Sequence, residues 1–160
     1  MKTELELELV KKYPKMLRDY KGDPMETCMS WGFEFDDGWY KLIDECMSKL
    51  QYFCDLCSKD GSEVQVVANQ IKEKYGTLSF YTSVYGGDNI QHDIIDDIID
   101  KAEAKSAYTC EVTGAHGEPC KRGGWYRTLC YEQARKDGYV ACKETTEAYW
   151  KEKDVKGSSI

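Results

Sequence analysis

The residues best suited to chemistry lie in the C-terminal half of the chain, where three cysteines and one histidine follow one another closely. These candidates are Cys110, His116, Cys120 and Cys130. Thiolate sulfur and imidazole nitrogen are common zinc ligands, and four of them complete a tetrahedral structural site. A complete zinc ribbon has C-x-x-C twice, whereas Thr113 and Gln133 stand where the second cysteine of each pair belongs. Two interpretations stay open, a zinc site made of these four residues or a metal-free module with reduced thiols.

Basic residues beside aromatic residues form a second candidate site, for ligand or partner binding. The segment 121–127 reads KRGGWYR, and Lys72 and Lys74 lie two residues apart in a predicted strand, which places both on one face. The seven candidates are Lys72, Lys74, Lys121, Arg122, Trp125, Tyr126 and Arg127. Cations beside stacking rings suit a nucleotide, a phosphorylated small molecule or an acidic protein patch. The alternative is that Trp125 belongs to the core and the cations are ordinary surface residues.

The sequence favours binding over catalysis. His92 falls within a predicted helix, and His116, in a loop beside Gly117, is the only histidine placed like a site residue. Gly86-Gly87 lacks the Lys and Ser or Thr that follow the glycines of a phosphate-binding loop. An enzyme remains open as an alternative, because catalytic groups from distant segments leave no signal in residue spacing.

The composition is that of one folded domain. The chain has 160 residues, of which 41% are hydrophobic and 32% charged, enough for both a core and a hydrated surface. No apolar run reaches the roughly 20 residues that span a bilayer, so we expect no membrane partner. The N-terminal segment 1–12 lacks the basic start and apolar middle of a signal peptide. We therefore expect a cytosolic protein, whose 8 cysteines are free thiols or metal ligands rather than disulfides.

The charge is uneven along the chain. The net charge is -7, and segments 33–63 and 88–105 are both acidic. Segment 121–143, in contrast, has six basic and two acidic residues, a balance of +4. An acidic chain neutralises phosphates poorly, so nucleic acid is not an expected partner. The basic segment is the one stretch where an anionic ligand would be favoured.

Hydrophobic periodicity predicts an α+β fold. Apolar residues recur at helical spacing from Trp39 to Cys57 and again from Ile90 to Ala102. Between these two main helices, alternating residues over 64–85 predict a β-hairpin with a turn at Tyr75-Gly76-Thr77. The two helices must cover one face of the small antiparallel sheet, and we expect Leu50 and Ile94 to be among the core residues.

Three further predictions concern the domain organisation and the C-terminal third. Residues 1–144 form a single domain, within which 108–144 is an irregular module rich in cysteine and glycine. A short helix from Leu129 to Lys136 ends at Gly138. Residues 145–160 are expected to be a charged tail that frays.

Several short blocks, in this order, resemble a widespread family of small accessory proteins encoded by tailed bacteriophages and prophages. The similarity runs from about Tyr13 to Tyr139, and the combination is specific although each block alone is weak. The main blocks are WGFE at 31–34, DGWYKLI at 37–43, QIKEKYGTLSFY at 70–81, TCEVTG at 109–114 and GGWYRTL at 123–129.

This resemblance implies a phage protein expressed in the cytosol of a bacterial host. Proteins of this kind often antagonise host defence or redirect a host enzyme, so we expect a non-enzymatic antagonist of a host or defence protein. One alternative is a sponge that sequesters a nucleotide-type small molecule, and another is a zinc-dependent nucleic-acid-binding module. Many relatives carry complete C-x-x-C pairs at the positions of Cys110 and Cys130, and Thr113 and Gln133 depart from them.

Overall fold

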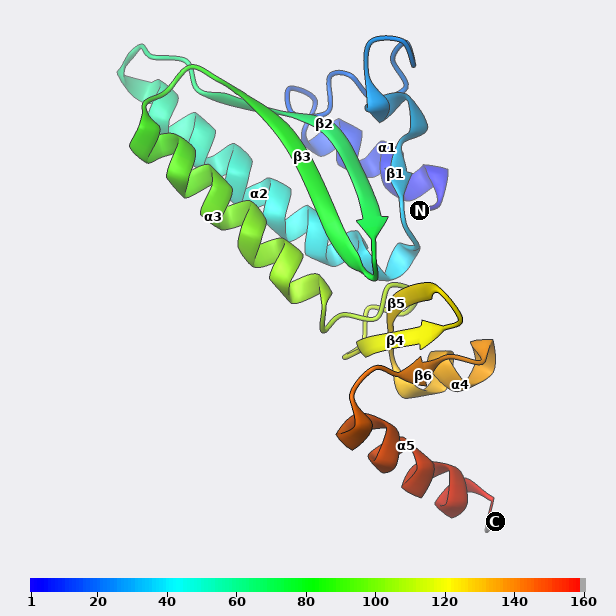
Figure 1. The fold of residues 1–160 in the computed structure, drawn as a ribbon. Helices are drawn as coiled ribbons and strands as arrows, with labels where there is room; N and C mark the ends of the chain where they lie inside the picture. The colour runs from blue at the N-terminus through cyan, green and yellow to red at the C-terminus, as the bar shows by residue number, and fades with distance from the viewer. Residues whose placement is uncertain (159–160) are drawn as a thin grey trace.

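A computed structural model describes residues 1–158, without the side chain of Asp60, and it confirms the predicted α+β fold. These residues form five α-helices and two three-stranded sheets (Figure 1). The helices are α1 (Thr3–Lys12), α2 (Tyr40–Cys57), α3 (Asn89–Ser106), α4 (Tyr131–Asp137) and α5 (Glu144–Gly157). The strands are β1 (Phe33–Glu34), β2 (Gln65–Lys74), β3 (Thr77–Tyr85), β4 (Glu118–Arg122), β5 (Trp125–Leu129) and β6 (Val140–Ala141). Short 3-10 helices are η1 (Cys28–Trp31), η2 (Asp37–Trp39) and η3 (Ser58–Asp60).

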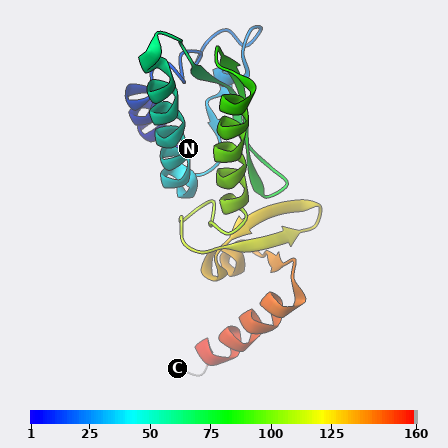
Figure 2. The ribbon, with the colours of Figure 1, turned by 90° about the vertical axis from the view of Figure 1, so that its left-hand side faces the viewer.

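The first sheet contains the predicted hairpin. Strands β2 and β3 pair antiparallel from Gln65↔Tyr85 to Lys74↔Thr77, and β1 adds a parallel strand at the free edge of β2. The sequence did not predict β1, because two residues are too few to show alternation. Helices α2 and α3 lie side by side along one face of the hairpin, as Figures 1 and 2 show.

The first core fills the space between these two helices and the sheet. Trp39, Ile43 and Leu50 from the α2 region are fully buried, together with Ile71 from β2 and Ile95 from α3. Cys46 and Cys54 are buried in the same cluster, where a free cysteine packs as a small apolar side chain.

Part of the prediction for α3 is wrong. Ile94 is 39% exposed and Ile90 is largely exposed, whereas Ile95, Ile99 and Ala102 face the core. The isoleucine pattern is broader than the narrow stripe that a helix can bury when its main contacts are with one helix and one strand, here α2 and β3.

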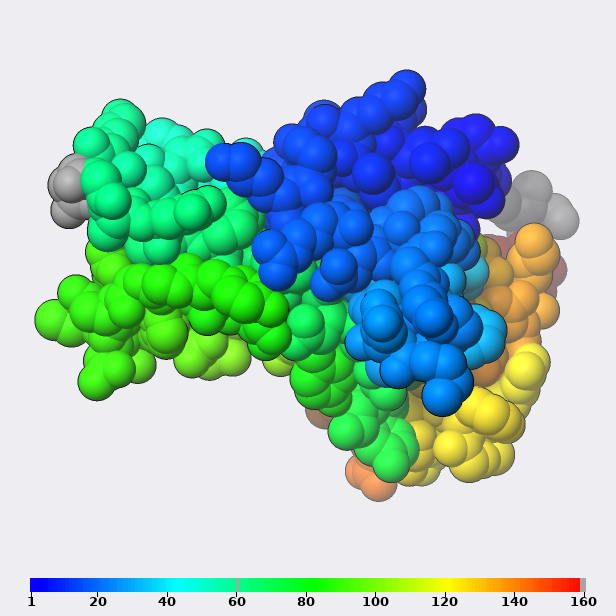
Figure 3. All heavy atoms as spheres, turned by 90° about the horizontal axis from the view of Figure 1, so that it is seen from above, coloured from blue at the N-terminus to red at the C-terminus, as the bar shows by residue number. Residues whose placement is uncertain are grey.

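The segment after α1 packs against β2 and completes the first core. Met16 and Leu17 are buried, and the Met16 carbonyl accepts a hydrogen bond from the Ala68 N–H at 2.9 Å. The buried Glu6 carboxylate accepts hydrogen bonds from the Tyr20 hydroxyl at 2.6 Å and from the Phe33 N–H at 3.2 Å. These contacts fix residues 13–35 beside the hairpin, as the view from above shows (Figure 3).

A second core belongs to the C-terminal module. Strands β5, β4 and β6 form its sheet in that order, and helices α4 and α5 pack around it. Its buried residues are Cys110, Cys120, Leu129, Cys130, Ala134, Tyr139, Ala141 and Trp150. Gly138, with a φ of +73°, ends α4 as predicted.

The predicted fraying tail is wrong for the residues that are described. Residues 144–157 form α5, and Trp150 is only 4% exposed, with its ring edge-on to Tyr131 at 6.0 Å. Arg135 from α4 binds Glu147 at 3.1 Å and Asp154 at 2.9 Å, so these ion pairs hold α5 against α4. One tryptophan within a charged stretch gives no periodic signal, and the sequence pattern therefore resembled a tail. Residues 159 and 160 of the predicted tail lie outside the described part.

Among residues 1–158, none of the helices combines the length and the apolar character that crossing a membrane requires.

Candidate functional site

The four predicted zinc ligands are not assembled into a site. His116 has a side chain that is 72% exposed; its ring stacks on Tyr108, and its Nε2 lies 3.2 Å from the Glu118 carboxylate. The Cys120 thiol donates to the Glu118 carbonyl at 2.9 Å, and burial raises the pKa of this thiol to about 12. Both groups therefore already have partners that a metal would have to replace, and Cys120 holds its proton.

Cys110 and Cys130, in contrast, lie together with Thr113. The Thr113 hydroxyl is 3.6 Å from the Cys130 sulfur, and the Gly114 N–H donates to the Cys110 carbonyl at 2.8 Å in a tight turn. Burial would raise the pKa of Cys110, but hydrogen bonds from the Thr113 side chain and from nearby backbone N–H groups lower it overall.

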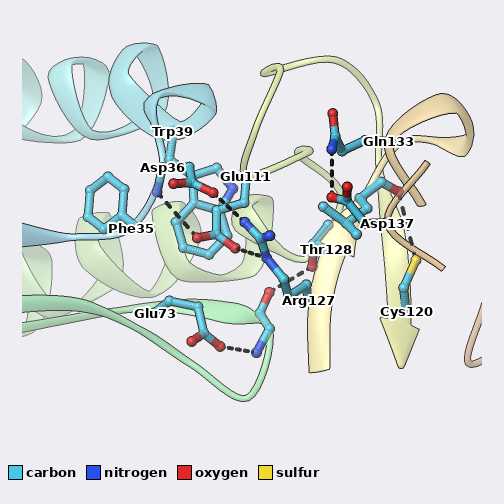
Figure 4. A network of polar contacts seen from close by, with 12 residues as sticks. Phe35, Asp36, Trp39, Glu73, Glu111, Cys120, Arg127, Thr128, Gln133 and Asp137 are labelled. Carbon is cyan, nitrogen blue, oxygen red and sulfur yellow. Dashed lines mark hydrogen bonds and ion pairs between the residues drawn. The ribbon is translucent and has the colours of Figure 1, made fainter. Parts of the chain in front are cut away.

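Gln133, at the position where a second cysteine would follow Cys130, adds no ligand to this cluster. The Gln133 amide turns to Asp137 on its own helix at 2.6 Å, as Figure 4 shows. In the described part of the chain, no three His, Cys, Asp or Glu side chains are grouped so as to hold a metal ion. The residues present thus do not fit the zinc site expected from Cys110, His116, Cys120 and Cys130.

The basic aromatic candidates divide into two kinds. Trp125 is 75% exposed and Tyr126 is 45% exposed at the start of β5, so the alternative that Trp125 is a core residue is wrong. Lys74 and Lys121 are exposed and Lys72 is half-buried, and Lys72 and Lys74 lie at alternate positions of β2. None of these three lysines has an ion pair among the described residues.

The two candidate arginines, Arg122 and Arg127, bind other groups of the chain and do not line an open site. The Arg127 guanidinium donates to Glu111 at 2.9 Å and also pairs with Asp36, and its side chain is only 23% exposed (Figure 4). Burial raises the pKa of Glu111 although Arg127 opposes that shift. Arg122 donates to the Asp137 carbonyl and lies 4.7 Å from the centre of the Tyr139 ring.

Arg127 is part of the junction between the two cores. Asp36 and Trp39 precede α2, and Trp39 belongs to the first core. The Trp39 indole N–H donates to the Thr109 carbonyl at 2.8 Å. The Gly38 N–H donates to the Glu111 carbonyl at 2.8 Å, and a Cβ at Gly38 would lie 2.4 Å from this same oxygen. The junction therefore needs a glycine at this position.

Tyr75 is a surface residue that the sequence pattern did not single out. Tyr75 and Gly76 form the two-residue turn between β2 and β3, with φ values of +53° and +89°. Such turns favour Asn-Gly, because a residue with a large side chain is strained at positive φ. The Tyr75 ring is nonetheless 80% exposed, with the Lys74 ammonium 6.0 Å from its centre. A tyrosine where this turn type favours asparagine is the signal in the sequence that identifies it.

The turn that carries Tyr75 is fixed in place. The Gly76 N–H donates to the Glu73 carboxylate, and the Gly76 carbonyl accepts from the buried Thr128 hydroxyl at 2.7 Å. The backbone of Arg127 is so close that a Cβ on Gly76 would lie 3.2 Å from its nitrogen. The tip of the first hairpin therefore rests on β5, as Figures 1 and 2 show.

We call the exposed rings and the lysines of these two hairpins the basic aromatic face. It consists of Lys72, Lys74, Tyr75, Tyr81, Lys121, Trp125 and Tyr126. Tyr81 joins it because the ring is exposed and the Lys72 ammonium lies 5.9 Å from its centre. The rings come from two hairpins that meet where the Thr128 hydroxyl donates to the Gly76 carbonyl, although these two residues lie 52 positions apart in sequence.

Neither histidine is arranged for nucleophilic catalysis. His92 Nε2 lies 2.7 Å from the Gly86 carbonyl, and His116 Nε2 faces the Glu118 carboxylate. The polar partner of each imidazole is thus a carbonyl or carboxylate oxygen, whereas a general base needs a hydroxyl or thiol to activate.

Comparison of the chain with protein-family models, with curated proteins and with solved structures finds no match.

Proposed function

We propose that this chain is a non-catalytic binding protein whose basic aromatic face docks on an acidic surface of a partner protein. The observation that carries the proposal is the exposure of Tyr75 and Trp125, 80% and 75%, on two hairpins that are in contact through the hydrogen bond from Thr128 to Gly76. Tyrosine and tryptophan are the side chains most enriched at the energetic centres of protein interfaces. Large rings held in water bury little apolar surface in the isolated fold, whereas a partner would bury them.

The rigidity of the face favours this function. The Thr128 hydroxyl and the Glu73 carboxylate hold Gly76 from both sides, so the Tyr75 ring loses little freedom when a partner covers it. Tyr75 is held at positive φ, where a large side chain is strained, and such strain is typical of residues retained for function.

The charge of the face indicates the chemistry of the partner. Lys72, Lys74 and Lys121 surround the rings without carboxylate partners, although the chain as a whole carries a net charge of -7. Such a local reversal of sign attracts an acidic surface and repels a basic one. The resemblance to phage accessory proteins supports a host or defence protein in the bacterial cytosol as this partner, with inhibition as the consequence of binding.

The proposal is tested by purifying the tagged chain from bacterial host cells and measuring what copurifies. We expect one host protein in equimolar amount, and we expect Y75A/W125A to lose it. Tyr52 is 70% exposed on α2, away from the face, so Y52A is the matched control and should retain the partner. The complex should also weaken with added salt, because lysines contribute to it. A partner retained in full by Y75A/W125A would contradict the proposal.

A further inference from the structure

A cavity of about 660 Å³ lies at the other end of the first hairpin, far from the basic aromatic face. It is bounded by Pro14, Lys15, Arg18, Glu63, Gln65, Tyr85 and Gly86. Gln65 and Tyr85 are paired at the open end of the hairpin, whereas Tyr75 lies at its turn. The segment after α1 forms the opposite wall, and Figure 3 shows this blue segment beside the green hairpin. The volume lies within the range of about 300–1,000 Å³ that is usual for small-molecule sites.

Two cations on one wall of this cavity have no acidic partner. Lys15 and Arg18 are both exposed, and neither makes a hydrogen bond or ion pair within the described part of the chain. The Arg18 guanidinium lies 4.7 Å from the centre of the Tyr85 ring. The cavity therefore offers unused N–H donors next to an aromatic surface, which is a combination that binds anions carrying planar rings.

The other polar groups of the cavity determine what else a ligand must contain. Glu63 supplies a carboxylate acceptor at the rim, and Lys15, Glu63 and Gln65 also border an adjoining cavity of about 240 Å³ that contains Asp55. The Gln65 amide is already bonded to the Val66 carbonyl at 2.8 Å. The carboxylates favour a ligand that presents hydroxyl or amino donors at a distance from its anionic group.

The walls are formed by fixed backbone. Gly86 has a φ of +72°, and a Cβ there would lie 1.8 Å from the Glu63 carbonyl oxygen, so only glycine closes the rim. The hydrogen bond from the Ala68 N–H to the Met16 carbonyl holds the segment of Lys15 and Arg18 against β2. The backbone around the cavity is therefore preformed, and a ligand would have to order only side chains such as those of Lys15 and Arg18.

We propose that this cavity binds a small organic anion with a planar ring, of the nucleoside monophosphate class. The phosphate lies against Lys15 and Arg18, the base lies against Tyr85, and the ribose hydroxyls or base amino groups donate to Glu63. This inference is independent of the docking function proposed above, because the two sites share no residue.

The test measures binding of AMP, GMP, CMP, UMP and inorganic phosphate to the purified chain by titration calorimetry. We expect saturable binding of at least one nucleotide. R18A and K15A should each weaken that binding about tenfold or more, because each removes a charge-assisted hydrogen bond. Y85L should weaken nucleotide binding but leave the affinity for inorganic phosphate unchanged, since only the ring contact is lost.

The control variant is K74A, which removes a lysine at the far end of the same hairpin and should leave nucleotide affinity unchanged. Arg18, Lys15 and Tyr85 are all exposed, and thermal unfolding of each variant should match that of the wild type. Lack of saturable binding by every nucleotide, or equal affinity of R18A and the wild type, would overturn the proposal. Neither result would affect the docking function, which Y75A/W125A tests.

Discussion

Arg127 has two carboxylate partners, Glu111 and Asp36, that lie in different parts of the chain. The Arg127 guanidinium is 2.9 Å from Glu111, whose side chain is 6% exposed. Removing one partner from a buried ion pair is costly because the remaining charge stays desolvated. The sequence suggested Arg127 as a ligand contact, since a basic residue next to Trp125 and Tyr126 looks the same whether or not a distant carboxylate meets it.

We predict that R127M lowers the free energy of unfolding by about 3–5 kcal/mol at neutral pH, because Glu111 is left buried and unpaired. Burial already raises the pKa of Glu111, and without Arg127 the pKa rises further. The folded variant then binds a proton more tightly than the unfolded chain does, so its stability recovers as the pH falls toward about 4. Urea titrations at several pH values measure this effect.

The matched control is K121M on β4, where the lysine has no ion pair, and its effect should stay below about 0.5 kcal/mol. E111Q/R127M should be more stable than R127M, since a neutral amide replaces the stranded carboxylate. An R127M loss no larger than that of K121M would show that the junction does not depend on this pair.

At the scale of elements, the sequence predicted those parts of the fold that carry a periodic signal. Trp39 to Cys57 repeats at helical spacing, and residues 64–85 alternate around a turn glycine, so α2, β2 and β3 all follow. The strand β1 and the helix α5 do not follow, because two residues cannot alternate and because Trp150 is the only buried residue of α5.

The candidate site was predicted only in part, because the local sequence shows neighbours along the chain but not contacts between distant segments. Local sequence brought Trp125 and Tyr126 together with Lys121, but it could not show that Arg122 and Arg127 have partners within the fold. Tyr75 was missed because its contribution depends on the Gly76 turn meeting β5, a contact between residues 52 positions apart.

The Tyr75-Gly76 turn allows stability and binding to be separated. We predict that Y75N stabilises the fold by about 0.5–1 kcal/mol, because asparagine tolerates positive φ better than tyrosine in this turn type. The same change removes the most exposed ring of the basic aromatic face and should weaken the partner complex. Denaturant midpoints and partner affinity, measured on one preparation, should show that Y75N raises the stability and lowers the affinity for the partner.

Y75F is the control for this prediction, because it keeps the ring and the strain and should change neither quantity much. A Y75N protein that is less stable than the wild type would mean that the tyrosine ring makes a stabilising contact within the fold.

At the scale of the whole molecule, two cores meet at a small polar junction. The first core lies between α2, α3 and the hairpin, and the second lies among β4, β5, β6, α4 and α5. Figure 1 shows α5 extending away from the first core, and Trp150 belongs only to the second. The basic aromatic face spans the junction, since Tyr75 belongs to one hairpin and Trp125 to the other. The geometry of the face therefore depends on both cores being folded.

We predict that W150A destabilises the C-terminal module by about 3–5 kcal/mol, the range for removing a buried tryptophan. The ring packs edge-on to Tyr131, and the Arg135 guanidinium lies 5.4 Å from its centre, so its loss loosens α5 from α4. Hydrogen exchange should accelerate in β4, β5 and α4, while amides of β2 and β3 keep their protection. Y149A changes an exposed neighbour on the same helix and should leave exchange as it is. Because the face needs both cores, W150A should also weaken partner binding although Trp150 lies outside the face. Equal acceleration in both cores would instead show that the molecule unfolds as one cooperative unit.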